Sequence, residues 1–233
     1  MPNKRGKFIV IEGTDGSGKA TQTALLLQRL RESGLAVETI DFPRHGEDSG
    51  KLVDLYLTGF FGESTKLNPK LISGFYAIDR LMNKPKINAW LDEGKIVIAD
   101  RYASSNIGHQ GAKIPDDKER EELFYWLHKM EFEEMKIPKP DMHIFLHVPS
   151  EVAFKLIEKK AQRRYLLGKI DGHEKNLDHL KAAEKSYLHA SKLFNWRIIE
   201  CSENNELLSI EKIHDKVWEQ ISIILQKQSK LKL

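Results

Sequence analysis

Apolar residues along this chain form two alternating patterns, short continuous runs and longer stretches with helical spacing. The short runs are rich in β-branched or aromatic residues, so each of them predicts a β-strand. They span residues 7–12, 36–42, 95–100, 141–148 and 196–201. The longer stretches place apolar residues three or four positions apart, as Ala24, Leu27 and Leu30 do, and therefore predict helices. They span residues 18–33, 50–57 and 68–92, and Pro85 predicts a kink or break in the last of them.

The order of these elements predicts the fold class. The last three strand runs are apolar almost throughout, which is typical of parallel strands that are buried on both faces. Helical stretches separate the strands, so the connections are βαβ crossovers. We therefore expect a single α/β domain over residues 1–233, a three-layer sandwich with a parallel sheet of about five strands. In such open sheets, ligands bind beyond the carboxyl ends of the strands.

The composition is that of an ordinary globular protein, with 40% hydrophobic residues and a net charge of +3 over 233 residues. This charge is too small for a dedicated nucleic-acid binder, so no nucleic-acid partner is expected. The longest apolar runs have about five to eight residues, well short of the roughly 20 that a membrane-spanning helix needs. The basic N-terminus passes directly into a strand without a signal-peptide core, and the single Cys201 fits a reducing compartment. A cytoplasmic location without a membrane partner is therefore expected.

A glycine-rich loop between the first strand and the first helix carries candidate chemistry. Gly13, Gly18 and Lys19 satisfy the spacing G-x-x-x-x-G-K. In such a P-loop, backbone N–H groups and the positive end of the following helix converge on phosphate oxygens, while the lysine reaches the outer phosphates. The sequence therefore predicts an ATP-binding loop. Its residues are Gly13, Thr14, Asp15, Gly16, Ser17, Gly18, Lys19, Ala20 and Thr21.

The loop lacks the hydroxyl group that normally joins the coordination shell of a magnesium ion. Ala20 stands where Ser or Thr is usual. Thr21 comes next, but one residue further along a helix points about 100° away, so it does not substitute directly. Asp15 in the loop and Asp100 at a strand end are the candidate ligands for Mg²⁺, directly or through water. The ion then depends more on water and phosphate oxygens than on the loop.

Four further motifs follow the P-loop in a specific order. They are "FPR" at residues 42–44, "DRY" at 100–102, "SSNIGHQGAK" at 104–113 and "PKPD" at 138–141. With the P-loop they resemble the thymidylate kinase family, and the resemblance covers residues 8–196. It implies a P-loop kinase fold and transfer of the γ-phosphoryl group of Mg²⁺-bound ATP to dTMP, which yields dTDP and ADP. Family members often form homodimers, and residues 123–135 have enough aromatic side chains for such a face or, equally, for a buried helix.

The resemblance also implies roles for individual residues. Asp15 resembles the loop carboxylate that approaches the sugar and phosphate of the acceptor, and Arg101 resembles the arginine that binds the acceptor phosphate. Arg80 resembles the arginine that contacts the thymine ring, and Tyr76 takes the place of the usual stacking Phe. His109 stands where the family more often has Phe or Tyr. The other acceptor-site candidates are Phe42 and Arg44, which border the acceptor, and Asn106, which screens its sugar or base.

Residues 160–176 resemble the lid that closes over ATP in this family. A catalytic arginine comes either from the P-loop or from the lid, and this P-loop has none. Arg163 and Arg164 are therefore the catalytic candidates that clamp the transferring phosphoryl group, with Lys169 behind them. The other lid candidates, near the acceptor, are Asp171, His173 and Glu174.

The same residues make chemical sense without the family. The acceptor phosphate is already an anion, so catalysis needs positioning and cations more than a strong base. Arg101 follows a strand end, and its planar guanidinium suits bidentate phosphate binding. The residues alone also fit a surface ion pair for Arg101, a surface position for Arg80, core packing for Tyr76, and ordinary loop roles for His109 and His173.

Two alternative functions stay open at this level. One is a P-loop kinase for a nucleoside or another monophosphate, because Tyr76 and His109 depart from the family pattern at the walls of the pocket. The other is a nucleotide-binding module that has lost catalytic activity, and Ala20 is the only residue that favours it. The presence of Lys19 and the arginines favours an active kinase.

Overall fold

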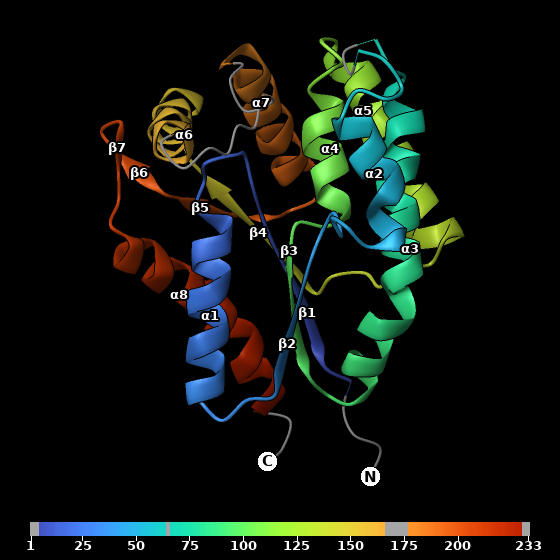
Figure 1. Cartoon of the computed structure of the whole chain (residues 1–233). Coiled ribbons are helices and arrows are strands. Elements are labelled where there is room, and N and C mark those ends of the chain that lie inside the picture. The colour runs from blue at the N-terminus through green and yellow to red at the C-terminus, as the bar shows by residue number, and fades with distance from the viewer. Residues whose placement is uncertain (1–4, 64–65, 166–176, 230–233) are drawn as a thin grey trace.

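The strands form one parallel sheet, shown for the computed structural model in Figure 1. The structure describes residues 5–63, 66–165 and 177–229. The strand order is β2-β3-β1-β4-β5, and every neighbouring pair is parallel. The strands are β1 Lys7–Gly13, β2 Val37–Asp41, β3 Ile96–Asp100, β4 Met142–His147 and β5 Arg197–Glu200. The predicted five-stranded parallel sheet is confirmed, and each boundary lies within one residue of the range read from the sequence.

Helices cover both faces of the sheet. They are α1 Lys19–Glu32, α2 Lys51–Leu57, α3 Pro69–Asp92, α4 Ala103–Gly111, α5 Asp117–His128, α6 Ser150–Tyr165, α7 Leu177–Leu193 and α8 Ile210–Ser229. Helices α1 and α8 lie on one side of the sheet in Figure 1, and α2 to α5 lie on the other. A short 3₁₀ turn, η1 Asp48–Gly50, precedes α2, and a π-helical segment, η2 Lys129–Glu134, continues α5. A small antiparallel hairpin, β6 Ser202–Glu203 with β7 Glu206–Leu207, was not expected from the sequence.

The central strand β1 is buried on both faces, which explains its continuous apolar run. Ile9 and Ile11 pack in the core cluster beneath α1 and α8. Phe8 and Val10, on the alternate positions, pack in the cluster beneath α3. All four side chains are fully buried, and each contributes about 1.5–3 kcal/mol through removal of apolar surface from water. The core therefore anchors the strand from which the P-loop emerges.

Helix α3 continues through Pro85, so the break expected at this residue is wrong. The Asn68 side chain caps the first turn by accepting a hydrogen bond from Lys70 N at 2.8 Å. After the proline, Ile87 and Leu91 are buried against the sheet. This packing stabilises the part of the helix that follows the proline, so the helix does not end at the hydrogen bond that Pro85 cannot make.

The carboxyl ends of the strands meet at one edge, because all five strands run in the same direction. Gly13, Asp41 and Asp100 are the last residues of β1, β2 and β3. The register pairs Asp100 with Asp41 on one side and with Ile11 on the other. The residue that follows Asp100 therefore lies beside the P-loop, although more than eighty positions separate them in the sequence.

We expect Gly111→Ala to destabilise the protein. A Cβ atom at Gly111 would lie 2.4 Å from Ser186 Oγ and 2.6 Å from Phe124 Cε1, and both of these side chains are fully buried. Helix α4 thus lies too close to α5 and α7 for an added methyl group, and the free energy of unfolding should fall by about 1–3 kcal/mol. Urea-induced unfolding measures this loss. Gly74→Ala is the matched control, because nothing lies within 4 Å of a Cβ there, and equal midpoints for the two variants would contradict the close packing.

Candidate active site at the carboxyl edge of the sheet

The loop between β1 and α1 is curled into an anion-binding shape. Gly16 and Gly18 have φ angles of 81° and 84°, in the left-handed region that favours glycine. A Cβ atom on Gly13 would lie 2.2 Å from Ser17 Oγ. Thr14 Oγ1 and Ser17 Oγ are buried and have no hydrogen-bond partner among the described residues. The glycines are thus required by the curl of the loop, and the unpaired hydroxyls suit an acceptor such as a phosphate oxygen.

Lys19 lies beneath this loop with its ammonium group short of counter-charge. Its Nζ donates to the carbonyl oxygens of Gly13 and Thr14, each at 2.9 Å, and only 8% of the residue is exposed. Burial, together with repulsion from Arg101, lowers the pKa of Lys19 to about 8, although nearby carboxylates including Asp15 act in the opposite direction. A bound polyphosphate would supply the missing negative charge, which is the role that the motif predicts for this lysine.

Arg101 reaches the same loop from the end of β3. Its φ angle is 67°, unusual for a residue other than glycine, and its backbone N–H donates to Ile11 O at 3.0 Å. Its guanidinium forms an ion pair with Asp15 through Nη2. Burial alone would raise the pKa of Asp15, but attraction to Arg101 and to Lys19 outweighs burial and holds this pKa well below its ordinary value. The structure therefore brings together three of the predicted site residues, Asp15, Lys19 and Arg101.

His109 stands beside this ion pair as a neutral ring. Its Nε2 lies 3.1 Å from Arg101 Nη1 and accepts from it. Burial and the neighbouring Arg101 lower the pKa of His109 to about 3, so the imidazole is uncharged at neutral pH. The ring stacks on His179, with centroids 5.8 Å apart and planes 16° apart, and meets Tyr187 edge-on at 5.8 Å. His109 therefore takes the place of an aromatic residue in the wall of the site.

A buried carboxylate, Glu12, fixes the start of α4 under Arg101. Glu12 has no exposed surface and accepts hydrogen bonds from Tyr102 N at 2.9 Å, Ser104 Oγ at 2.8 Å, Ser105 Oγ at 2.9 Å and Tyr187 OH at 3.1 Å. Sequence reasoning missed this residue. The sequence did contain one indication of its role, a single charged residue in the apolar run of β1 immediately before Gly13. A charged side chain is buried in a strand only when hydrogen bonds or counter-charges stabilise it.

Arg80, Asn106 and Tyr76 form a second group next to the first. Arg80 is 1% exposed, and its Nη1 lies 3.4 Å from the carbonyl oxygen of Tyr102, the residue after Arg101. Its main partner is Glu131, which accepts from Arg80 Nε at 2.6 Å and from Nη2 at 2.7 Å. Asn106 Nδ2 lies 3.2 Å from Glu131 Oε1. Glu131, for which the sequence offered no local signal, joins Arg80 and Asn106.

Tyr76 of the second group is also close to the charges of the first group. Burial raises the pKa of its phenol above the ordinary value, and among the charges that act on it are Arg101, Arg80 and Asp15. Its ring meets Tyr56 edge-on, with centroids 6.3 Å apart. The side chain is neither a fully enclosed core residue nor an exposed one, so it fits the predicted position beside a flat base.

Phe42 and Arg44 lie at the rim, with their side chains engaged elsewhere. Phe42 is 4% exposed and packs on the Tyr102 ring at a centroid distance of 5.6 Å. The Arg44 guanidinium pairs with Asp41 at 2.6 Å and with Glu47 at 3.1 Å. The predicted contact of Arg44 with the acceptor therefore needs a change of partner.

The remaining predicted residues are only partly covered by the structure. Ala20 and Thr21 are exposed in the first turn of α1. Arg163 and Arg164 belong to the last turn of α6, but the positions of their side chains lie outside the description. The other lid candidates lie outside the described residues, and they are Lys169, Asp171, His173 and Glu174.

The carboxylates at this edge offer limited support to a metal ion. Within residues 5–63, 66–165 and 177–229, no group of three or more His, Cys, Asp or Glu side chains is arranged to hold one. Asp15 is already paired with Arg101. Burial, with Glu12 and Asp41 nearby, raises the pKa of Asp100, and no described residue hydrogen-bonds to its carboxylate. A divalent cation would stabilise the ionised form of Asp100, so these residues fit an ion that takes most of its ligands from phosphate and water.

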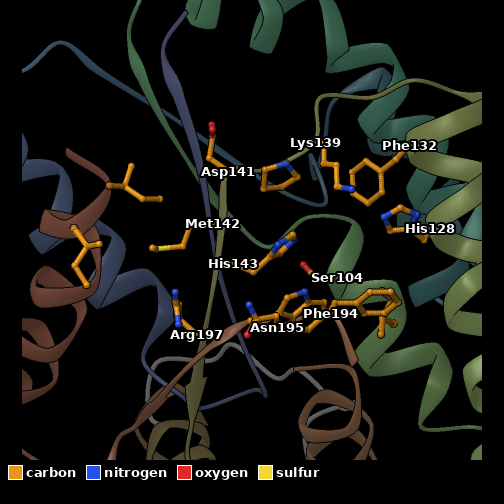
Figure 2. A pocket seen from close by; sticks show the side chains of 15 residues that line it. Ser104, His128, Phe132, Lys139, Asp141, Met142, His143, Phe194, Asn195 and Arg197 are labelled. Carbon is orange, nitrogen blue, oxygen red and sulfur yellow. The ribbon is translucent and has the colours of Figure 1, made fainter. Parts of the chain in front are cut away.

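A cavity of about 360 Å³ is lined mainly by residues of α4, α5, η2, β4, β5 and α8. Figure 2 shows that His143 and Phe132 point into it, with Asp141 and Arg197 at its borders. Asp141 precedes β4 and Arg197 begins β5, so the cavity lies at the amino edge of the sheet. It contains none of the residues predicted for the nucleotide or the acceptor, although it shares Ser104, a donor to Glu12, with the site described above.

The fold and the loop define the class of protein, and comparison with known proteins defines the family. A parallel sheet of order β2-β3-β1-β4-β5 with a G-x-x-x-x-G-K loop after β1 is the fold of P-loop nucleoside monophosphate kinases. The sequence model described as "Thymidylate kinase" matches residues 11–217. The chain belongs to the thymidylate kinase family.

Individual relatives agree with this assignment. The chain is 31% identical to a probable thymidylate kinase of Pyrococcus horikoshii, over 91% of this chain and 94% of the relative. It is 30% identical to the thymidylate kinase of Schizosaccharomyces pombe, over 94% of this chain and 92% of the relative. The solved structure of thymidylate kinase from Candida albicans superposes with a TM-score of 0.71 at 24% identity, covering 94% of this chain and 92% of the other, and supports the fold.

The helices of the described part of the chain were also compared with the requirements of a membrane span. Among residues 5–63, 66–165 and 177–229, none of the helices combines the length and the hydropathy that crossing a bilayer demands.

We expect His109→Phe to make the free energy of unfolding less dependent on pH below pH 6.5. The folded-state pKa of His109, about 3, is below its ordinary value of 6.5, so below pH 6.5 the unfolded chain binds the proton more readily. The folded state therefore loses stability as the pH falls, and Phe removes this loss. Between pH 6.5 and pH 5 the free energy of unfolding of wild type should fall by about 1.5 kcal/mol more than that of the variant.

Urea unfolding at these two pH values measures the difference. All other histidines are common to both proteins, so their contributions cancel in the comparison. Parallel profiles for wild type and His109→Phe would show that His109 is not enclosed as a neutral ring beside Arg101.

Proposed function

We propose that this protein transfers the γ-phosphoryl group of ATP to dTMP and so produces dTDP and ADP. Its family supports the reaction, and one observation in the site carries it. Lys19 from the P-loop and Arg101 from the end of β3 both interact with the carboxylate of Asp15. When nucleotides bind, Lys19 turns to the outer phosphates of ATP and Arg101 to the phosphate of the acceptor. Two cations, one at the start of α1 and one just after β3, then hold the two anions end to end.

The proposed reaction needs no strong general base. A phosphate oxygen of the acceptor attacks the γ-phosphorus, and the bond from this phosphorus to the β–γ bridging oxygen breaks. The bond electrons leave with ADP, and no proton has to be removed from a dianionic acceptor. Lys19 and Arg101 lower the repulsion between the reactants, and the unpaired hydroxyls of Thr14 and Ser17 can donate to phosphate oxygens.

The acceptor base is proposed to lie against the second group of residues. Arg80 and Asn106 contact the edge of the thymine ring, while Tyr76 flanks its face. His109 closes the wall near the sugar and phosphate, and Asp15 approaches the same end of the acceptor. The electrostatic proximity of Tyr76 to both Arg80 and Arg101 supports a single acceptor that reaches from one group to the other.

Magnesium is proposed as the cofactor of ATP. When bound, the ion neutralises phosphate charge and polarises the transferring group. Asp100 is its protein ligand, directly or through water, and Asp15 is the second candidate. The raised pKa of Asp100 and the absence of a hydrogen-bond partner for its carboxylate among the described residues support this role.

The catalytic arginine of the lid is proposed to be Arg163 or Arg164. Helix α6 packs directly on the P-loop, because a Cβ on Gly16 would lie 3.0 Å from Ala153 O and 3.0 Å from Ile157 Cγ1. At about 1.5 Å of rise per residue, Arg163 follows Ile157 after roughly 9 Å of helix. The end of α6 is therefore near enough to the P-loop for a lid arginine to reach the transferring group.

A cytoplasmic location is proposed with these partners. ATP and dTMP are small soluble nucleotides, and the net charge of +3 gives no reason to add a nucleic acid as a further partner. The single Cys201 is a buried free thiol, which fits a reducing compartment.

A panel of acceptors tests the activity. With ATP and Mg²⁺, wild type should release ADP fastest with dTMP among nucleoside monophosphates and nucleosides. Lys19→Ala should lower kcat/KM by a factor on the order of 10²–10³, because it removes a cation that faces the transferring group. Lys118→Ala, an exposed lysine of α5, is the matched control and should keep wild-type activity. A better acceptor than dTMP, or tight ATP binding without any ADP release, would contradict the proposal.

A homodimer is also proposed, through α3. Four apolar side chains on this helix are exposed: Leu71 and Met82 by 56%, Ile78 by 38% and Leu81 by 37%. By contrast, Leu123, Phe124 and Leu127 of α5, in the segment considered for this role from sequence, are buried within the chain. The alternative of a buried helix therefore holds for these three residues of α5, and the exposed face of α3 is the better candidate for contact with a second copy.

We expect Met82→Glu to shift the protein from dimer to monomer. A charge at the centre of an apolar interface would have to be buried without a partner, and this weakens association by several kcal/mol. Sedimentation velocity at micromolar concentration distinguishes the two masses. Lys155→Glu on α6 is the control for the change in charge. A wild-type protein that sediments as a monomer, or a variant that stays dimeric, would exclude this interface.

A further inference from the structure

A carboxylate without exposed surface lies behind the proposed base-binding group. Glu131 belongs to η2, the π-helical segment that continues α5. It accepts two hydrogen bonds from Arg80, at 2.6 Å from Nε and 2.7 Å from Nη2, and one from Asn106 Nδ2 at 3.2 Å. A carboxylate can only accept hydrogen bonds, so it dictates that both of its neighbours present donors to it.

This constraint fixes the orientation of the Asn106 amide. Asn106 Nδ2 donates both to Glu131 and to the carbonyl oxygen of Ser73 at 3.1 Å, so both amide protons are used. No described residue hydrogen-bonds to Asn106 Oδ1. The nitrogen is thus held toward Glu131, and the oxygen is left as an acceptor.

The same constraint fixes which part of Arg80 is available. Its Nε edge faces Glu131, and Nη1 makes a long contact of 3.4 Å with Tyr102 O. One N–H on Nη1 and one on Nη2 have no hydrogen-bond partner among the described residues. Arginine has no acceptor atom, so this side chain can only donate to a ligand. Arg80 and Asn106 together therefore offer a donor beside an acceptor.

We infer that Glu131 is a positioning residue that sets the hydrogen-bonding polarity of the base-binding group, and thereby selects a base with a carbonyl next to a ring N–H. Thymine has this arrangement at O4 and N3, so its carbonyl accepts from Arg80 and its N3–H donates to Asn106 Oδ1. Cytosine has the reverse arrangement, an amino group next to an unprotonated ring nitrogen. Its amino group would face the Arg80 donor and its ring nitrogen would face the acceptor Asn106 Oδ1, so neither hydrogen bond could form. This inference rests on the proposed function and adds to it the residue that enforces the choice of base.

The geometry of η2 explains how a charged residue reaches this position. Single π-helical turns widen a helix and often occur at functional sites. Here Glu131 faces the base-binding group, whereas His128 and Phe132 face the cavity at the amino edge of the sheet (Figure 2). Their rings pack together at a centroid distance of 5.0 Å. Aromatic packing therefore stabilises the segment on the side of the cavity, while Glu131 on its other side points toward Arg80 and Asn106.

Glu131→Gln tests this role, because Gln has nearly the same shape but adds a donor. Its amide replaces one of the two acceptor oxygens with a donor, so the side chain can no longer accept all three hydrogen bonds from Arg80 and Asn106, and these two lose their fixed orientation. We expect the KM for dTMP to rise at least about tenfold, and the ratio of kcat/KM for dTMP to that for dCMP to fall at least about tenfold. The KM for ATP should stay within about twofold of wild type, because the P-loop is untouched. Glu134→Gln, an exposed residue of the same segment, should leave all of these values unchanged.

The outcomes separate positioning from a merely structural role. A structural role would lower the amount of active enzyme, and with it kcat for both acceptors, while the KM for dTMP and the dTMP-to-dCMP ratio stay as in wild type. That result overturns the inference. If Glu131→Gln does not fold, Asn106→Leu gives a second test, since it keeps the Arg80–Glu131 pair and removes the acceptor together with the amide donor to Glu131 and Ser73. The ratio should again fall about tenfold, and an unchanged ratio overturns the inference.

The same assays distinguish this inference from the proposed function. A wild-type protein that does not phosphorylate dTMP defeats both. A wild-type protein that prefers dTMP, combined with unchanged selectivity in Glu131→Gln and Asn106→Leu, defeats only the role of Glu131.

Discussion

The structure depends on the need to neutralise several enclosed charges at the carboxyl edge of one sheet. Lys19 and Arg101 interact there with each other and with the carboxylates of Asp15, Asp100 and Glu12. A charge removed from water is tolerated only when a counter-charge or hydrogen bonds replace its hydration. Asp15 and Arg101 satisfy each other, and Glu12 is satisfied by four donors. Lys19 is left with two carbonyl oxygens and a lowered pKa, so the edge is prepared for an added anion.

Helix α4 connects these charges to the proposed base-binding group. Arg101 lies just before the helix, Asn106 and His109 lie within it, and Glu12 holds its first turn to β1. The helix is fixed from outside by close packing at Gly111 against α5 and α7. Because one short helix carries residues for both groups, the distance between the phosphate end and the base end is set by helix geometry. Rigid spacing of this kind favours an acceptor of one length, as expected for a monophosphate with one sugar and one base.

Three departures from the usual pattern of the family fit the same picture. His109 is kept neutral by burial and by Arg101, so it replaces an aromatic ring without adding charge. Tyr76 has a raised pKa and stays a neutral phenol beside two arginines. Ala20 removes one ligand from the loop, and Asp100 is the nearby carboxylate that no described residue hydrogen-bonds. In each case the neighbouring charged and buried groups at the carboxyl edge of the sheet make the substituted residue compatible with the site.

The sequence by itself determined the sheet, the P-loop and most members of the site. Apolar periodicity and glycine spacing are local properties, so the five strands, the loop from Gly13 to Lys19 and the strand-end position of Arg101 were all predictable from it. Only the tertiary structure decided which side chains face each other. Glu131 and Tyr187 reach the site from distant segments, and nothing near them in the sequence signals a role. Glu12 lies next to the P-loop, but only its isolated charge in β1 signalled a role. The continuity of α3 through Pro85 was likewise decided by packing, because burial of Ile87 and Leu91 outweighs the local cost of proline. Patterns along the chain specify elements, but the pairing of buried charges depends on how those elements are brought together in space.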